Sequence, residues 1–355
     1  RNTFEVLMIR SIYILGLLLI SLGVKAQGLD PEFSLFNYQP LTINPALAGN
    51  SEAKWSLNLS AREQNYVISQ PYRSGIASFD INLPINAWAG NIWGFGLNVV
   101  SDDQGDVRMI NRRYNLTLSV GQYLDPRQQH SLSVGFQGGL GQRAIDYSSV
   151  YWNNQWVGEG FALYLPPGEN LPTDVKSYFD MSTGIQYSYD GDLADISVGY
   201  GMFHANTPDN SLYIDSANTQ LDRRHTIHFN MEHRLRKDNL FALRPSFLIT
   251  RQGKTNNVIL GNDFVFYFNE PTRTTGKRKE YSMSLGLFHR VQKDMIATLM
   301  LNLAGFSFGT SYDVSVGNLN RLNGYQGAWE VFVGYKAGFR KGSNSRYMPN
   351  KKGRL

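Results

Sequence analysis

The strongest constraint on the fold of this chain is an alternation of apolar and polar residues that runs from Ala53 almost to the C-terminal end. A period of two is typical of β-strands, because successive side chains point to opposite faces of a sheet. The alternation predicts an all-β protein of about 14 strands, each bounded by turn residues. The strands are expected to begin near Lys54, Arg73, Ile92, Ile110, Gln129, Ser177, Leu193, Arg224, Phe241, Asn257, Glu280, Asp294, Phe306 and Ala328.

These strands have one apolar face and one polar face. In one of them Ile227, Phe229 and Met231 share a face, whereas His228 and Glu232 share the other. The runs extend over roughly ten residues or more, the length that a tilted membrane-crossing strand needs, whereas soluble sandwiches use strands of about 5–6 residues. The pattern therefore predicts a transmembrane antiparallel β-barrel.

Residues 1–26 have the layout of a secretory signal peptide. Arg10 supplies the positive charge, residues 12–24 form the apolar stretch, and Ala26 is the small residue before Gln27. A short amphipathic or re-entrant anchor is the alternative, because the stretch is shorter than the roughly 20 residues of a spanning helix. The sequence contains no cysteine, which excludes a lipid-modified cysteine and disulfides. Export combined with a barrel pattern predicts localisation in the outer membrane.

The sequence divides into four parts. We expect a signal peptide at 1–26, an N-terminal segment at 27–52, the barrel at 53–339 and a basic tail at 340–355. The tail is expected to be solvated or to touch an acidic partner or lipid headgroups. Its basic residues are Arg340, Lys341, Arg346, Lys351, Lys352 and Arg354.

The stretch LFNYQPLTINPALAG, residues 35–49, breaks the alternation. Asn44 is suited to cap a helix, Pro45 to its first position and Gly49 to the position just past its end, so NPALAG, which includes Ala46, predicts one helical turn. Pro40 is expected to keep its neighbours extended. The apolar residues of the segment need burial, so we expect it to plug or cover the periplasmic end of the barrel. A periplasmic linker that orders only on a partner is the alternative. The apolar residues are Phe33, Phe36, Tyr38, Leu41 and Ile43.

Two connections are much longer than the others, at 146–174 and 206–222. Both follow odd-numbered strands, which would place them outside the cell if the mature N-terminus is periplasmic. Their large apolar residues are candidates for binding a secreted cargo protein, or they pack onto the top of the barrel. These candidates are Trp152, Trp156, Phe161, Tyr164, Leu212 and Tyr213. The glycines at 133–142 predict a crowded spot in the lumen or a bend of the sheet, and a bulge with no other role is the alternative.

The sequence contains no phosphate-binding loop, zinc-protease pattern or Gly-x-Ser-x-Gly motif. The dense group of His225, His228, Glu232 and His233 splits between two strand faces, which argues against a metal site. Basic residues show no interleaving that would predict nucleic-acid binding. We therefore expect no enzyme activity and no cofactor, with a catalytic Ser or His at the barrel rim as a further alternative.

Several motifs together resemble the PorP/SprF family of outer-membrane proteins of Bacteroidota. DPEFSLFNYQPLTINPALAGN contains the Ile-Asn-Pro-Ala-x-Ala-Gly pattern with which the family begins. GMFHANTPDNSLY is similar to its His-x-Asn-x-Pro segment, with His204 and Pro208. FSFGTSYDVSVGNL, with Tyr312 and Asp313, followed by GAWEVFVGYK, resembles its closing strands. FALRPSFLITRQG resembles the middle strand with its proline. The resemblance extends from Asp30 to Lys336 and is not carried over to the basic tail past Phe339. Leu47 stands where an aromatic residue is common.

The resemblance implies a role in type IX secretion and gliding. Members of the family support export or surface anchoring of large secreted proteins, often adhesins. The implied partners are the cargo protein or its C-terminal domain and periplasmic ring components. As an outer-membrane barrel, the chain is also expected to contact outer-membrane lipid and lipopolysaccharide. A passive porin or small-molecule transporter remains the alternative, because polar inward faces and a wide lumen would also permit it.

Overall fold

A computed structural model describes most of the chain. The described residues are 30–50, 53–66, 70–83, 91–105, 108–147, 150–166, 168, 175–191, 194–212, 220–234, 240–268, 281–317 and 323–339. The predicted signal peptide and basic tail lie outside these ranges. No helix in the described part is both long enough and apolar enough to cross a membrane.

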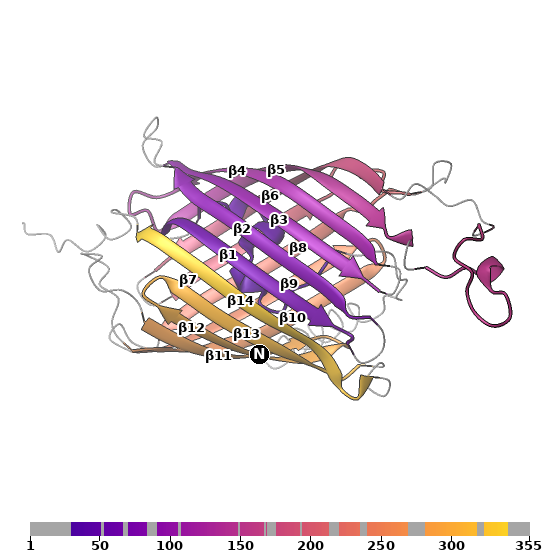
Figure 1. The fold of residues 1–355 in the computed structure, drawn as a ribbon. Helices are drawn as coiled ribbons and strands as arrows, with labels where there is room; N and C mark the ends of the chain where they lie inside the picture. The colour runs from indigo at the N-terminus through magenta and orange to yellow at the C-terminus, as the bar shows by residue number, and fades with distance from the viewer. Residues whose placement is uncertain are drawn as a thin grey trace, which may run out of the picture.

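The described residues form a closed barrel of fourteen antiparallel strands, in which each strand pairs with the next and β1 pairs with β14 (Figure 1). The closing pair runs from Ala53 opposite Phe339 to Gln64 opposite Ala328, so no sheet edge is left along it. The strands are β1 Ala53–Gln64, β2 Tyr72–Leu83, β3 Asn91–Gln104, β4 Met109–Tyr123, β5 His130–Ile145, β6 Val175–Asp190, β7 Ala194–Phe203, β8 Arg224–Arg234, β9 Phe241–Gln252, β10 Thr255–Tyr267, β11 Tyr281–Arg290, β12 Asp294–Leu303, β13 Phe306–Ser315 and β14 Gln326–Phe339.

The outer face of the barrel is apolar. Leu116, Leu118 and Phe136 are 55%, 58% and 65% exposed, because alternation turns them away from the lumen. A continuous exposed apolar surface of this kind is unfavourable in water and suits the lipid hydrocarbon. The protein is therefore an outer-membrane barrel, and this confirms the predicted fold class and localisation.

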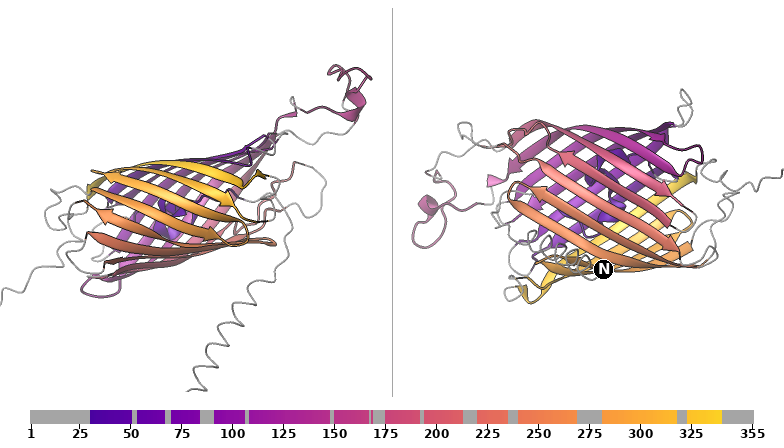
Figure 2. Two further views of the ribbon diagram at one scale, coloured as in Figure 1. Left: turned by 90° about the horizontal axis from the view of Figure 1, so that it is seen from below. Right: turned by 180° about the vertical axis from the view of Figure 1, so that it is seen from behind.

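The two ends of the barrel differ. We call the end where β1 begins at Ala53 the terminal rim, because β14 also ends there at Phe339. The opposite end, where β1 finishes at Gln64, is the loop rim. The long connections after β5 and β7 leave from the loop rim. Figure 2 shows that residues 150–166 stand away from the barrel beyond this rim.

The N-terminal segment lies inside the barrel as three single turns of 3-10 helix, drawn in indigo in Figure 1. They are η1 Phe36–Tyr38, η2 Pro40–Thr42 and η3 Pro45–Leu47. Asn44 caps η3 by accepting a hydrogen bond from the backbone of Ala46 at 2.9 Å, and Gly49 has a φ of 62°. The predicted helical turn is confirmed. The expectation that Pro40 keeps the chain extended is wrong, since proline also suits the first position of a helical turn.

The predicted partial plug was confined to one end of the barrel, whereas the segment reaches further along the lumen. Asn50 and Gly49 lie near the terminal rim, where the backbone N–H of Gly49 donates to Asp80 at 3.2 Å. Asp30 lies near the loop rim, where its backbone N–H donates to Gln252 in the last position of β9 at 3.1 Å. The segment therefore spans most of the barrel height, from one rim towards the other.

Candidate functional site in the barrel lumen

Apolar side chains of the N-terminal segment pack against apolar side chains of the barrel wall. Phe36 and Ile43 form a buried cluster with residues of β9 to β12, and the rings of Phe36 and Phe288 meet edge to face with centroids 6.0 Å apart. Leu35 packs on Met300 and Phe332. Burying a side chain of this size contributes about 1.5–3 kcal/mol, so these contacts stabilise the docked segment.

Polar side chains of the wall satisfy the carbonyl groups that the short turns leave unpaired. The hydroxyl of Ser119 donates to the carbonyl of Ala48 at 2.6 Å, and the amide of Asn82 donates to that of Gly49 at 2.7 Å. On the opposite side Thr226 donates to the carbonyl of Ile43 at 2.5 Å. Unpaired buried carbonyls are costly, so these bonds fix the path of the backbone.

Asn44 connects the segment to the middle of the wall. Its side-chain amide donates to the carbonyl of Ile185 at 2.9 Å and lies 3.2 Å from Nε2 of His228. Asn44 and His228 are both fully buried. One side chain thus caps η3 and also joins the segment to β6 and β8.

Two wall glycines mark where the segment backbone touches the barrel. A Cβ atom on Gly135 of β5 would overlap the backbone of Pro45 and Ala46, and one on Gly94 of β3 would overlap the carbonyl of Ala48. Only glycine permits this approach of two backbones. For Gly135, the prediction of a crowded spot in the lumen is confirmed.

A first ionic cluster holds the start of the segment near the loop rim. The carboxylate of Asp30 lies 2.7 Å from Arg113, 3.0 Å from His204 and 3.3 Å from Arg224. Nδ1 of His204 lies 2.9 Å from the carboxylate of Asp180. We call these five residues the Asp30 cluster. Its charges come from the N-terminal segment, β4, β6, β8 and the connection after β7.

The geometry of the Asp30 cluster favours an ionised histidine. Burial by itself lowers the pKa of His204, but the charge of Asp30 and the hydrogen bonds to Asp180 and Asp30 raise that pKa above its ordinary value. Burial by itself raises the pKa of Asp30, but Arg113, His204 and Arg224 hold it well below its ordinary value. An imidazolium that donates to two carboxylates accounts for both distances.

A second ionic cluster holds Ser34. Its hydroxyl lies 2.8 Å from the carboxylate of Asp313 and accepts hydrogen bonds from Arg62 and Arg290 at 2.7 and 3.0 Å. The backbone N–H of Ser34 donates to Glu330 at 2.8 Å. The side chains of these four charged residues are at most 5% exposed. We call this group the Ser34 cluster; it joins the segment to β1, β11, β13 and β14.

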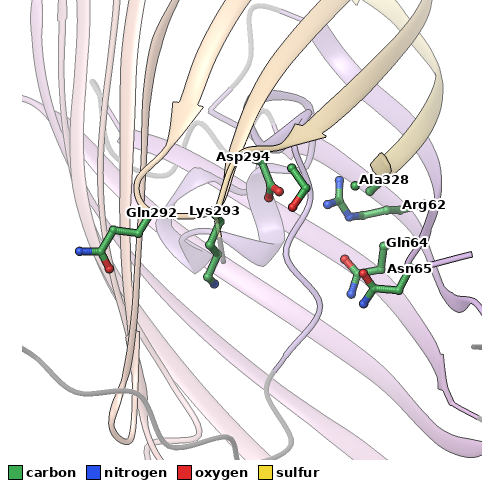
Figure 3. Close-up of a pocket in the computed structure, with 10 residues that line it drawn as sticks. Arg62, Gln64, Asn65, Gln292, Lys293, Asp294 and Ala328 are labelled. Atoms are coloured by element: carbon green, nitrogen blue, oxygen red, sulfur yellow. The ribbon is translucent and has the colours of Figure 1, made fainter. Parts of the chain in front are cut away.

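The packed segment leaves little open space in the described part of the lumen. A cavity of about 150 Å³ lies at the loop rim beside the Ser34 cluster (Figure 3). Arg62 and Gln64 of β1 and the adjoining Asn65 line one side of it. Lys293 of the β11–β12 turn and Asp294 at the start of β12 line the other. Two smaller cavities, of about 20 and 30 Å³, flank the Asp30 cluster. At roughly 10–15 Å³ for each water, these two hold only a few water molecules.

The structure gives the predicted motif residues different roles. His204 belongs to the Asp30 cluster and Asp313 to the Ser34 cluster, although the sequence indicated no partner for either. Tyr312 points outward and is 41% exposed. The carbonyl of Pro208 accepts a hydrogen bond from the backbone of Leu221 at 2.8 Å, which closes the connection after β7. His204 and Asp313 thus contact the N-terminal segment, whereas Pro208 shapes the connection at the loop rim.

The predicted loop residues are only partly brought together. The ring of Phe161 lies 5.1 Å from that of Trp156, and the ring of Trp152 lies 6.4 Å from that of Tyr147. Tyr164 is 85% exposed, whereas Leu212 is buried at 5% and offers no free surface. Tyr213 lies outside the described residues.

The histidines of β8 divide as the alternation predicts. His228 and Glu232 face the lumen, whereas His225 lies on the outside, where its Nδ1 is 2.7 Å from the hydroxyl of Tyr200. Glu232 is engaged by Arg244 at 2.8 Å. Among the described residues no group of three or more His, Cys, Asp or Glu side chains is placed to hold a metal ion.

Sequence reasoning missed most members of the two ionic clusters. The missed residues lie on the polar face of strands, close to the loop rim, and each carries a charge. That position was a usable signal, because a charge facing the lumen needs a partner when the lumen is filled. These residues are Arg62, Arg113, Asp180, Arg224, Arg290 and Glu330.

Comparison with known proteins places these features in context. A family model described as "Type IX secretion system membrane protein PorP/SprF" matches residues 25–335. The toluene transporter TbuX of Ralstonia pickettii has a similar structure, with a TM-score of 0.50 and 9% identity, over 85% of this chain and 94% of that chain. The deltaS2 mutant of the TodX monoaromatic hydrocarbon channel is also similar, with a TM-score of 0.50 and 8% sequence identity, over 85% of this chain and 94% of that chain. At such low sequence identity, these structural similarities show the barrel architecture alone. No curated protein matches the sequence.

Proposed function

The chain belongs to the PorP/SprF family of type IX secretion system membrane proteins, and from this membership we propose that it is a non-enzymatic barrel that supports export or surface anchoring of a particular secreted cargo protein. Its partners would be the cargo or the C-terminal domain of the cargo, together with periplasmic ring components. In this proposal the barrel is an adapter held in the outer membrane by its apolar surface, and its lumen is not a route for cargo.

The packing of the N-terminal segment is the observation that carries this proposal. Residues 30–50 pass between the two rims, and both ionic clusters join them to the wall. A passive porin needs a continuous water-filled path, which these contacts oppose. An adapter needs only a rigid frame and surfaces at its two rims.

The connection after β5 is the surface we propose for cargo. Tyr151, Trp156, Phe161 and Tyr164 are all exposed, and Figure 2 shows their segment standing beyond the loop rim. Large aromatic side chains supply much of the binding energy of protein interfaces. This role would also explain why the segment projects rather than lying on the barrel.

Co-purification tests the adapter role. The barrel is tagged at its C-terminus and extracted in mild detergent, and its partners are identified by mass spectrometry. We expect a large secreted protein or its C-terminal domain. A double variant Trp156→Ser and Tyr164→Ser should lose that protein, whereas Glu159→Ser, an exposed polar change in the same loop, should retain it. Recovery of the barrel alone in every preparation would contradict the adapter role.

Conductance tests the closed lumen separately. The purified barrel is reconstituted in planar bilayers, and its ion conductance is compared with that of a variant lacking residues 30–46. We expect low conductance from the complete chain and a large increase in the variant. Equal conductance of the two proteins would refute the closure and favour the porin alternative.

A further inference from the structure

Arg143, at the loop rim, has no charged partner among the residues that the structure describes. Arg143 lies on the lumen face of β5, where Asn111 and Lys176 are its direct neighbours on β4 and β6. Its one hydrogen bond to a described residue runs from the guanidinium to the sulfur of Met109 at 3.0 Å, and a thioether is a weak acceptor. The Nε atom of Arg143 is buried and has no hydrogen-bond partner.

The surroundings of Arg143 do not compensate this charge. Lys176, directly opposite, is positive as well, and Asp209 engages it at 3.1 Å. Like charges on directly opposed residues destabilise a sheet. A half-buried guanidinium without a carboxylate therefore costs stability, and this cost would fall if an anion bound there.

A small cavity opens beside this guanidinium. It has a volume of about 30 Å³ and is lined by Arg143, Tyr178, Asn111 and Asn210 among others. The ring of Tyr178 lies over Gly141, where a Cβ atom would overlap it. The hydroxyl of Tyr178 makes no hydrogen bond to a described residue, so it is a second available donor.

Two carboxylates also line the cavity, but both are already engaged. Asp30 contacts Arg113, His204 and Arg224, and Asp102 accepts hydrogen bonds from Ser74 at 2.5 Å and from Gln104. Neither is within ion-pair distance of Arg143. Their negative charges would oppose a second charge on any ligand, which disfavours phosphate groups with two charges.

We propose that this cavity is a binding site for a single carboxylate group, held by the guanidinium of Arg143 with the hydroxyl of Tyr178 as a second donor. The flat guanidinium fork matches a carboxylate in geometry and charge. The carboxylate can belong to a small organic acid or to the C-terminus of a peptide that reaches the rim. This site does not depend on the proposed role in secretion.

Site-resolved protection from chemical modification tests the proposal. The complete purified barrel is treated with phenylglyoxal, which modifies guanidinium groups, in the presence of increasing acetate. Modification of each arginine is followed by mass spectrometry. Arg112, on the exposed outer face of β4, is the internal control. We expect acetate to protect Arg143 and to leave Arg112 unaffected. Equal protection of the two, or protection of neither, would overturn the proposal.

Further ligands distinguish a peptide C-terminus from a small organic acid, and a carboxylate from other groups. A short peptide with a free C-terminus should protect Arg143, and the same peptide with an amidated C-terminus should not. Protection by the free peptide at lower concentration than acetate would assign the site to peptide termini; equal concentrations would assign it to small acids. Protection by the amide, or by inorganic phosphate at lower concentration than acetate, would refute a carboxylate site.

A conservative variant tests the second donor. Tyr178→Phe keeps the ring over Gly141 and removes only the hydroxyl. We expect the concentration of acetate for half protection of Arg143 to rise at least about tenfold, the effect of losing one hydrogen bond to a charged group. Phenylglyoxal reactivity of Arg143 without acetate should remain unchanged, which would show that the cavity is intact. An unchanged half-protection concentration would exclude Tyr178 as a ligand.

Discussion

The carboxylate of Asp30 lies 3.0 Å from Nε2 of His204, although 174 residues separate them in the sequence. This contact joins the start of the N-terminal segment to the turn that follows β7. His204 has a φ of 56°, a left-handed conformation that is uncommon outside glycine. The turn therefore accepts backbone strain in order to aim the imidazole at Asp30 and Asp180.

Replacing Asp30 by Asn should release the start of the segment. The change leaves Arg113 and Arg224 buried without their counter-charge, and losing one partner of a buried pair costs about 3–5 kcal/mol. We expect faster proteolysis of the segment and a lower midpoint of unfolding in urea. Asp209→Asn is the control, because the Lys176–Asp209 pair is largely exposed and should contribute less than about 1 kcal/mol. Equal effects of both variants would contradict the role of the Asp30 cluster.

Docking of the segment should weaken both when the pH is raised and when it is lowered. The stabilisation from His204, whose pKa is raised, is complete below its ordinary pKa and is lost as the pH rises through the raised value. The stabilisation from Asp30, whose pKa is lowered, is present above its ordinary pKa and is lost as the pH falls through the lowered value.

The protease sensitivity of the segment should therefore increase as the pH rises through the raised pKa of His204, and again in acid as the pH falls through the lowered pKa of Asp30. His204→Gln should remove the first change and keep the second. Sensitivity in the native protein that stayed constant as the pH rose above the ordinary pKa of histidine would rule out an ionised His204.

Replacing Gly135 by Ala should displace η3 from the wall. The new Cβ atom would overlap the backbone of Pro45 and Ala46, which cannot move aside as a flexible side chain could. Gly138→Ala is a matched control on the same strand, because its Cβ atom would meet only the ring of Phe179, at 3.7 Å. We expect increased ion conductance for Gly135→Ala alone. Similar conductance in the two variants would mean that this backbone contact does not hold the segment.

Changes at Asn44 should separate its two roles. Asn44→Ser keeps an uncharged side-chain oxygen that can cap η3 but loses the donor to Ile185, whereas Asn44→Ala loses both. Loss of a helix cap costs about 0.5–2 kcal/mol. Urea unfolding should therefore show the Ala variant to be less stable than the Ser variant, and the Ser variant to be less stable than the native protein. Equal stability of the Ala and Ser variants would show that the cap contributes nothing.

The strands were predictable because their signal is local. Each observed strand begins within two residues of its predicted position, since the alternation and the turn residues lie within the strand itself. The turn at Asn44 and Pro45 was predictable for the same reason. The motifs also singled out His204 and Asp313, but they did not predict which residues either side chain contacts.

The contents of the lumen were harder to predict because they depend on distant residues. Ile259, Ile296 and Met300 face the lumen and pack on or beside the segment, yet apolar residues on the lipid face look the same in a sequence. The partners of a charge such as Arg290 come from other strands and from the segment, at distances that periodicity does not encode. The same distant partners determine how far the N-terminal segment extends along the lumen, so the sequence did not predict that extent.

The position of the N-terminal segment also constrains the order in which the molecule assembles. Ser34 precedes β1 but contacts Asp313 of β13, 279 residues later. Its site is therefore incomplete until the last hairpin has formed and β14 has closed on β1. Contacts of such long sequence separation are slow to form, because much chain entropy is lost before they stabilise the product. The first residues of the folded part are thus among the last to reach their native contacts, and a barrel that fails to close would also leave its own N-terminal residues unplaced.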